Sequence, residues 1–231
     1  MARVPRPASR VSRRASPVRH CTGVVLAGGA NTRFDGLPKG LASVDGQRVV
    51  DRVLEALGPV CDELLLITND LTIQEAIPSV VARPDVRAER SSLVGLHSAL
   101  TLCRDAALVV AWDMPFLSTA LLARLRDIGE ESDVAVMPTG PYGPEPLCAY
   151  YPKQALPVVE RQLDKAELRL ASLVNELPGR VILSFDEVTA FGPPARLFAN
   201  INSAGDLAAV EHLESGERAA NSLLGTSAEH R

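Results

Sequence analysis

The chain has 231 residues, of which 46% are hydrophobic, 23% charged and 4% aromatic, a composition typical of globular proteins. No apolar run approaches the ~18 residues that a membrane-spanning helix needs, which excludes an integral membrane protein. The cysteines are far apart and form no Cys-x-x-Cys pair, so we predict reduced thiols in a cytoplasmic protein rather than a zinc site or a disulfide scaffold. They are Cys21, Cys61, Cys103 and Cys148. We expect one folded domain over residues 21–216.

The charge is unevenly distributed along the chain. The net charge is −4 even though residues 1–20 carry six arginines and no acidic residue, so the rest of the chain is strongly acidic. An acidic body argues against nucleic acid as a partner. Residues 1–20 lack the apolar stretch of a secretory signal and are predicted to be a disordered basic tail; a transit peptide or a wrongly assigned start codon would have the same composition. Residues 217–231 are predicted to form a flexible C-terminal tail.

The first half of the folded chain alternates short apolar strands with helices. Strands are predicted at 22–27, 63–67, 79–82 and 106–111, and helices at 47–57 and 93–102. Because the strands do not alternate apolar with polar residues, they are typical of a parallel sheet buried on both faces. We therefore predict an α/β fold of three layers around a doubly wound, mostly parallel sheet. Ligands of such sheets bind beyond the carboxyl ends of the strands, where Asp85 and Asp113 fall.

The second half is less regular. Strands are predicted at 134–137, 147–151 and 181–185, with a late strand at 196–201. Helices are predicted at 154–163 and 168–177, followed by a final helix that Ser203 caps and that includes Leu207, Val210 and Leu213.

A glycine-rich segment with two basic residues directly follows the first strand. Gly28 and Gly29 allow backbone N–H groups to approach phosphate oxygens closely, while Arg33 and Lys39 supply positive charge for a triphosphate. The segment has neither the Walker A spacing nor a Gly-x-Gly-x-x-Gly pattern. A pair of glycines alone would indicate a structural turn, but the basic residues at this spacing favour a phosphate-binding loop.

This loop carries a family resemblance. Its pattern LAGGxxxRxxGxxKG resembles the signature of nucleotidyltransferases with an N-terminal nucleoside triphosphate-binding half, and most closely the molybdenum cofactor guanylyltransferases. Later segments agree in order and extend the resemblance from residue 22 to about residue 213. They are Asp85, Leu93-Val-Gly95, Asp113-Met-Pro115, Glu145-Pro-Leu147 and Asn200-Ile-Asn202.

The resemblance implies a Rossmann-like nucleotidyltransferase fold and a reaction. The GMP part of GTP would be transferred to the phosphate of molybdenum-molybdopterin, with release of pyrophosphate. The nucleotide-binding half would span about 21–115 and the acceptor-binding half about 116–216. The resemblance leaves open a homo-oligomer and transient contacts with cofactor-handling proteins, and it includes neither nucleic acid nor membrane as a partner.

The chemistry of nucleotidyl transfer gives these residues their expected roles. Phosphoryl chemistry needs charge neutralisation and alignment more than acid–base work, so Arg33, Lys39 and Asp113 are the expected catalytic residues. Asp113 is the expected Mg²⁺ ligand, because Mg²⁺ takes one or two carboxylates together with phosphates and water. The nucleotide would also contact further residues, although the alternative is that Asp85 and Asp113 are turn residues at strand ends. These further contacts are Leu26, Ala27 and Gly28 at the guanine base, with Gly29, Asn69 and Asp85.

Three positions depart from the family pattern. Asp35 stands where the family often has glycine, and Ser92 replaces the glycine before Leu93, where it could still cap a helix. The family's nucleotide-binding asparagine aligns with Ile67, and Asn69 lies two residues further on the same face of an extended strand. These departures keep a degenerate nucleotide-binding protein without turnover as an alternative function.

Rival enzymes transfer other nucleotides. Cytidylyl relatives have alanine where this chain has Gly28, so Gly28 leaves room for a purine base and favours GTP. Sugar-phosphate and isoprenoid-precursor nucleotidyltransferases share the loop and stay open as alternatives. Elsewhere, Trp112 is predicted to pack in the core rather than stack on a ligand. His97, on the leucine face of a helix, is predicted to be a boundary residue rather than a ligand.

Overall fold

The computed structural model describes residues 19–28, 33–34, 37–201 and 206. Several predicted features lie outside the described residues: Gly29, Asp35, Asn202, Ser203 with the final helix, the tail up to residue 18, and residues 217–231. Arg19 and His20, which were assigned to the tail, belong to the described fold. Arg19 pairs with Asp133, and the His20 N–H donates to Asp105 at 3.0 Å, so the prediction of a tail reaching residue 20 is wrong by two residues.

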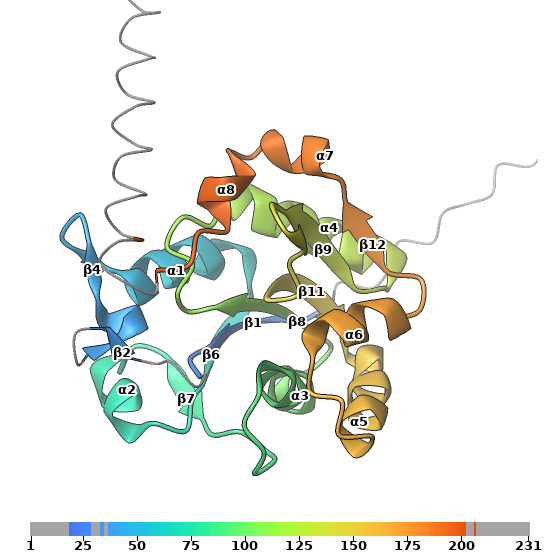
Figure 1. Cartoon of the computed structure of the whole chain (residues 1–231), viewed down its shortest axis with the longest axis horizontal. Helices are drawn as coiled ribbons and strands as arrows, with labels where there is room; N and C mark the ends of the chain where they lie inside the picture. The colour runs from blue at the N-terminus through green and yellow to red at the C-terminus, as the bar shows by residue number, and fades with distance from the viewer. Residues whose placement is uncertain (1–18, 29–32, 35–36, 202–205, 207–231) are drawn as a thin grey trace, which may run out of the picture.

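A mixed sheet forms the centre of the molecule. Its strand order is β10-β9-β11-β8-β1-β6-β7, and β12 pairs with β9 (Figure 1). Strands β1, β6, β7 and β8 run parallel, whereas β11 is antiparallel to both β8 and β9. The strands are β1 (Cys21–Leu26), β6 (Glu63–Ile67), β7 (Val81–Arg83), β8 (Ala106–Ala111), β9 (Val136–Gly140), β10 (Gly143–Pro144), β11 (Cys148–Pro152) and β12 (Val181–Leu183). Two short hairpins stand apart from the sheet, β2 (Arg33–Phe34) with β3 (Leu37–Pro38), and β4 (Ser43–Val44) with β5 (Gln47–Arg48).

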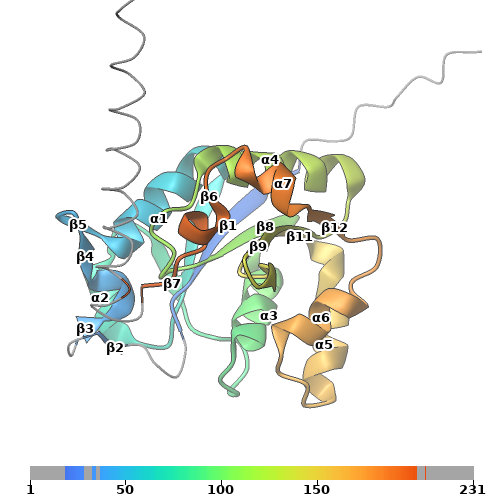
Figure 2. The ribbon, with the colours of Figure 1, turned by 45° about the horizontal axis from the view of Figure 1, so that its top comes forward.

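Helices cover both faces of the sheet. On one side lie α1 (Val49–Leu57), α4 (Thr119–Ser132), α7 (Phe185–Thr189) and α8 (Pro194–Leu197) (Figure 2). On the other side lie α3 (Ser92–Leu102), α5 (Leu156–Asp164) and α6 (Leu170–Glu176). The short helix α2 (Leu71–Ala76) links β6 to β7, and 3-10 turns occupy η1 (Lys39–Leu41), η2 (Gly58–Val60) and η3 (Lys153–Ala155). This arrangement confirms the predicted three-layer α/β fold.

The continuous apolar strands are explained by burial on both faces. Val25 and Val110 pack into the core beneath α1 and α4, while their neighbours Val24 and Val109 pack into the core beneath α3 and α5. Successive strand residues point to opposite faces, so every position of β1 and β8 is buried.

Several predicted elements are wrong in the second half. Helix α4 was missed, although Ser118 caps it and leucines at spacings of three and four residues line its buried face. The late strand predicted at 196–201 is wrong, because Pro193 and Pro194 begin helix α8 instead. Proline is suited to the first turn of a helix, where a backbone N–H would have no partner within the helix. Strand β12 ends before residue 185 because Ser184 and Glu187 form a capping box that starts α7.

Smaller differences concern caps and short helices. Helix α3 is capped by Ser91, whose Oγ accepts the N–H of Val94 at 3.2 Å, so Ser92 is the first helical residue rather than the cap. Helix α2 was also missed; Asp70 caps it by accepting the N–H of Thr72 at 2.9 Å. No helix within the described ranges is long and apolar enough to cross a membrane.

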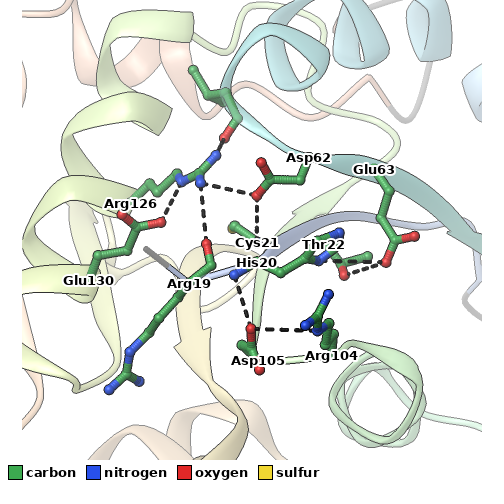
Figure 3. Close-up of polar contacts among 11 residues, drawn as sticks. Arg19, His20, Cys21, Thr22, Asp62, Glu63, Arg104, Asp105, Arg126 and Glu130 are labelled. Carbon is green, nitrogen blue, oxygen red and sulfur yellow. Dashed lines mark hydrogen bonds and ion pairs between the residues drawn. The ribbon is translucent and has the colours of Figure 1, made fainter. Parts of the chain in front are cut away.

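The amino-terminal edge of the sheet is tied together by a polar network (Figure 3). Arg126 of α4 donates to the carbonyl oxygen of Val60 at 2.8 Å and to the carboxylates of Glu130 at 2.6 Å and Asp62 at 3.0 Å. Asp62 in turn accepts the N–H of Cys21, the first residue of β1, at 2.8 Å. This network fixes the start of β1, at the edge opposite the predicted binding site.

Candidate active site

The strand order places a switch point between β1 and β8. From β1 the chain crosses to β6 on one side, and later returns to β8 on the other side, so the carboxyl ends of β1 and β8 open a crevice between diverging connections. The register aligns Leu26 with Ala111 across this pair. The predicted nucleotide and metal residues therefore gather at one edge of the sheet.

The end of β1 presents backbone to this edge rather than side chains. Leu26 and Ala27 are buried, and the Ala27 N–H donates to the carbonyl oxygen of Ile67 at 2.9 Å. Gly28 is exposed, and a methyl group added there would meet no atom within 4 Å. A ligand at Gly28 would thus approach main-chain atoms, as the predicted phosphate and base contacts require.

Lys39 and Asp113 come together although 74 residues separate them in the chain. Arg33 pairs with Pro38 through the β2–β3 hairpin, which brings the backbone of Arg33 beside that of Lys39. Lys39 is only 8% exposed, and Asp113 is half-buried. Burial raises the pKa of the Asp113 carboxyl, and the nearby positive charge of Lys39 opposes this rise. The pair combines a cation with a desolvated carboxylate at the switch point.

Trp112 contacts both the end of β1 and the segment after Lys39, and it directly precedes Asp113. Its N–H donates to the carbonyl oxygen of Leu26 at 3.3 Å, which joins the residue before Asp113 to the end of β1. Its indole packs directly on Gly40, so closely that an added methyl group there would lie 2.7 Å from Trp112 Cδ2. Trp112 is 3% exposed, which confirms that it packs in the core. This contact could not be predicted from the sequence, because only the fold brings residue 40 to residue 112.

The segment after Asp113 is held from two sides. The Ile201 N–H donates to the carbonyl oxygen of Asp113 at 3.1 Å. The ring of Phe116 lies 5.9 Å from the guanidinium carbon of Arg52 and 5.2 Å from that of Arg196. These contacts limit the movement of the loop that carries the carboxylate.

Asn69 and Asp85 form a second polar group, after β6 and β7. Asn69 Nδ2 donates to Asp85 Oδ2 at 2.7 Å, and the Asp85 N–H donates to Asn69 Oδ1 at 2.9 Å. Ser98 of α3 supports the pair by donating to Asp85 Oδ1 at 3.2 Å, a role that the sequence did not indicate because Ser98 lies on an otherwise apolar helix. Ile67 is buried in the core, whereas Asn69, two residues after the end of β6, is exposed at the binding edge.

The donor set at Asp113 fits Mg²⁺ bound together with a nucleotide. Within the described part of the chain, no three His, Cys, Asp or Glu side chains cluster in a way that could hold a metal ion alone. A lone carboxylate suits Mg²⁺, which commonly takes one or two carboxylates and completes its shell with phosphate oxygens and water.

Other candidates do not take part in this geometry. His97 of α3 is buried, and its Nε2 lies 3.7 Å from Oε1 of Glu160 on α5. It therefore packs between two helices rather than at the binding edge of the sheet. All four cysteines are free, as predicted.

Known proteins are similar to this chain in sequence and in fold. Residues 23–181 match the family model of the MobA-like NTP transferase domain. The molybdenum cofactor guanylyltransferase of Desulfosudis oleivorans is 34% identical over 191 residues, which cover 82% of this chain and 94% of that protein. The crystal structure of molybdopterin-guanine dinucleotide biosynthesis protein A from Archaeoglobus fulgidus superposes with a TM-score of 0.71 at 28% identity, covering 84% of this chain and 99% of the other.

A more distant structure shows the fold alone. The 4-diphosphocytidyl-2C-methyl-D-erythritol synthase of Anaerococcus prevotii has a TM-score of 0.61 at 14% identity and covers 85% of this chain and 96% of its own. The family model spans most of the described residues, and the 34% identical relative covers most of the chain. The chain belongs to the family of MobA-like NTP transferase domains.

Proposed function

We propose that this protein transfers the GMP part of GTP to the phosphate of molybdopterin and releases pyrophosphate. The single observation that carries the proposal is the proximity of buried Lys39 to half-buried Asp113 at the switch point of the sheet. The named activities of the similar proteins support guanylyl transfer and a molybdopterin acceptor. The proposal includes Mg²⁺ as cofactor and a cytoplasmic location, the latter supported by the four free thiols.

Residues at different strand ends would have different roles in binding and catalysis. The backbone at Leu26, Ala27 and Gly28 receives the guanine base, and the Asn69–Asp85 pair contacts the nucleotide from β6 and β7. Lys39, together with Arg33 on the neighbouring strand of the hairpin, balances the negative charge of the triphosphate and of the leaving pyrophosphate. Asp113 would hold Mg²⁺, which supplies Lewis-acid polarisation of the α-phosphate when bound.

The two substrates would bind at different parts of the sheet. The nucleotide residues follow β1, β6 and β7, in the half that spans about 21–115, whereas the acceptor would lie on the side of β11, in the half that spans about 116–216. Nucleotidyl transfer needs the attacking and leaving oxygens roughly in line across the α-phosphorus, so the entering phosphate and the pyrophosphate would occupy opposite sides of that phosphorus atom.

The test is pyrophosphate release from GTP, Mg²⁺ and molybdopterin by the wild type and two variants. Lys39→Ala should lower kcat/KM by about 100-fold or more, as removal of other charge-stabilising donors does. Asp113→Asn should abolish turnover while GTP binding, measured by calorimetry, persists. Lys165→Ala is the matched control, because Lys165 is a solvent-exposed lysine whose Nζ lies 3.8 Å from Glu176 Oε1. Full activity of Lys39→Ala or Asp113→Asn would refute the proposed roles, and no turnover by the wild type would refute the function.

A further inference from the structure

One carboxylate lies on the acceptor side of the site without an assigned role. Strand β11 pairs with β8 so that Cys148 aligns with Val110, and the Ala111 N–H donates to the carbonyl oxygen of Leu147 at 2.9 Å. Glu145 lies two residues before Leu147, in the turn between β10 and β11, and this turn follows the carboxyl end of β8. Glu145 therefore lies at the binding edge, separated from the nucleotide residues of β1, β6 and β7 by β8.

The Glu145 side chain packs closely on a neighbouring strand. It packs on Gly140 at the end of β9, where an added methyl group would lie 2.8 Å from Glu145 Cγ and 2.9 Å from Cδ. The backbone fixes the residue as well, because its N–H donates to the carbonyl oxygen of Pro138 at 2.9 Å and its own carbonyl oxygen accepts the N–H of Cys148 at 3.0 Å. Only a glycine at position 140 allows this contact.

The carboxylate itself has no partner among the residues that the structure describes. Glu145 is half-buried, and its two oxygens accept no hydrogen bond and form no ion pair within the described ranges. Burial raises the pKa of Glu145 to about 7, and no positive charge offsets the rise. A carboxylate that is partly desolvated and unpaired costs free energy in the empty protein, and a ligand with N–H donors would recover it.

The reaction geometry indicates which ligand reaches this position. Lys39 and the backbone of Arg33 lie on the side of β1, where the triphosphate and its leaving group are expected. The acceptor must enter from the opposite side of the α-phosphorus, which is the side of β11 and Glu145. A pterin ring carries an amide N–H beside an amino group, two parallel donors that one carboxylate accepts together.

We infer that Glu145 is an acceptor-binding residue whose carboxylate receives the paired N–H donors of the pterin ring. The inference rests on the proposed function and adds to it the residue that distinguishes an acceptor with this donor pair from a plain sugar phosphate. Guanine carries the same donor pair, but its expected place beside Gly28 lies on the other side of β8. A change at Glu145 should therefore affect the binding of the acceptor without affecting the binding of the nucleotide.

The experiment uses the full-length protein with Glu145→Gln, an isosteric change that removes one acceptor oxygen and the charge. The KM for molybdopterin at saturating GTP and Mg²⁺ should rise about 10- to 100-fold, the loss of one to two charge-assisted hydrogen bonds. The affinity for GTP, measured by calorimetry, should change less than twofold. Glu167→Gln is the matched control, because Glu167 is exposed and its only described contact is a backbone hydrogen bond to Gln162.

A second measurement does not depend on turnover. A phosphorylated pterin is titrated into the wild type and both variants in the presence of Mg²⁺ and a non-hydrolysable GTP analogue, and binding is followed by pterin fluorescence. Weaker binding to Glu145→Gln alone, with an unchanged or higher Tm, supports the inference. Equal pterin binding by wild type and Glu145→Gln, or a loss of GTP affinity instead, overturns it. Binding of GTP without any binding of pterin by the wild type overturns both the inference and the molybdopterin acceptor, while leaving nucleotide recognition intact.

Discussion

Replacement of Gly40 by alanine tests whether packing on Trp112 positions the catalytic residues. Gly40 follows Lys39, and Trp112 precedes Asp113, so the contact between residues 40 and 112 determines how the cation and the carboxylate face each other. The backbone at Gly40 does not have a positive φ, so alanine meets no conformational penalty there. The effect of Gly40→Ala should therefore be steric alone.

The magnitude follows from the distances. A methyl group on residue 40 would lie 2.7 Å from Trp112 Cδ2 and 2.9 Å from Cζ3. Ordinary carbon contacts are about 3.5–4.0 Å, so η1 and the indole must separate by about 1 Å. Overpacking of this kind costs about 1–3 kcal/mol of stability. A displacement of about 1 Å at a reacting centre can reduce the rate on the order of 100-fold.

The assay combines three readouts. We expect kcat for guanylyl transfer to fall about 10- to 100-fold, Tm to fall by several degrees, and the emission of Trp112, the single tryptophan of the chain, to change. Because Trp112→Phe removes ring atoms at this contact, the double variant Gly40→Ala/Trp112→Phe should be less impaired than the two single effects added together. Wild-type kcat in Gly40→Ala, or strict additivity in the double variant, would refute the positioning role.

Two further predictions follow from other contacts. Gly28→Ala should leave Tm within about 1 °C, since the methyl group meets open space, yet weaken GTP binding more than CTP binding; equal changes in the two calorimetric affinities would contradict the base-pocket argument. The hydrogen bond from the Cys21 N–H and the charge of Arg126 lower the pKa of Asp62 below its ordinary value, so Asp62 stabilises the fold at neutral pH and loses this contribution as the pH falls below about 4. Asp62→Asn should accordingly reduce the free energy of unfolding by at most about 1 kcal/mol at pH 7, since its side chain is 40% exposed, and by less at pH 3; the same loss at both pH values in denaturant titrations would contradict this account.

Local patterns predicted the elements that depend on nearby residues. Strands 63–67 and 106–111 agree with the observed bounds, because a run of apolar β-branched and leucine residues between turn signals specifies a two-sided strand by itself. The wrongly predicted elements also have local causes. Helix α4 has only three hydrophobic positions that are fully buried, and its outer face is polar. Pro193 and Pro194 start a helix where a strand is predicted at 196–201.

In the candidate site, too, some features follow from local sequence and others only from tertiary structure. Its residue types and their order along the chain, from Gly28 through Lys39 and Asp85 to Asp113, were determined by the sequence, because the phosphate-binding loop and the strand-end aspartates are local features. Their relation was decided by tertiary structure. The pairing of β1 with β8 brings Asp113 to Lys39, the indole of Trp112 packs on Gly40, and Ser98 supports Asp85. The turn that precedes antiparallel β11 places Glu145 at the same edge of the sheet. Contacts between residues more than 70 positions apart, such as Gly40 and Trp112, depend on how strands cross and pair, and no local periodicity encodes that order.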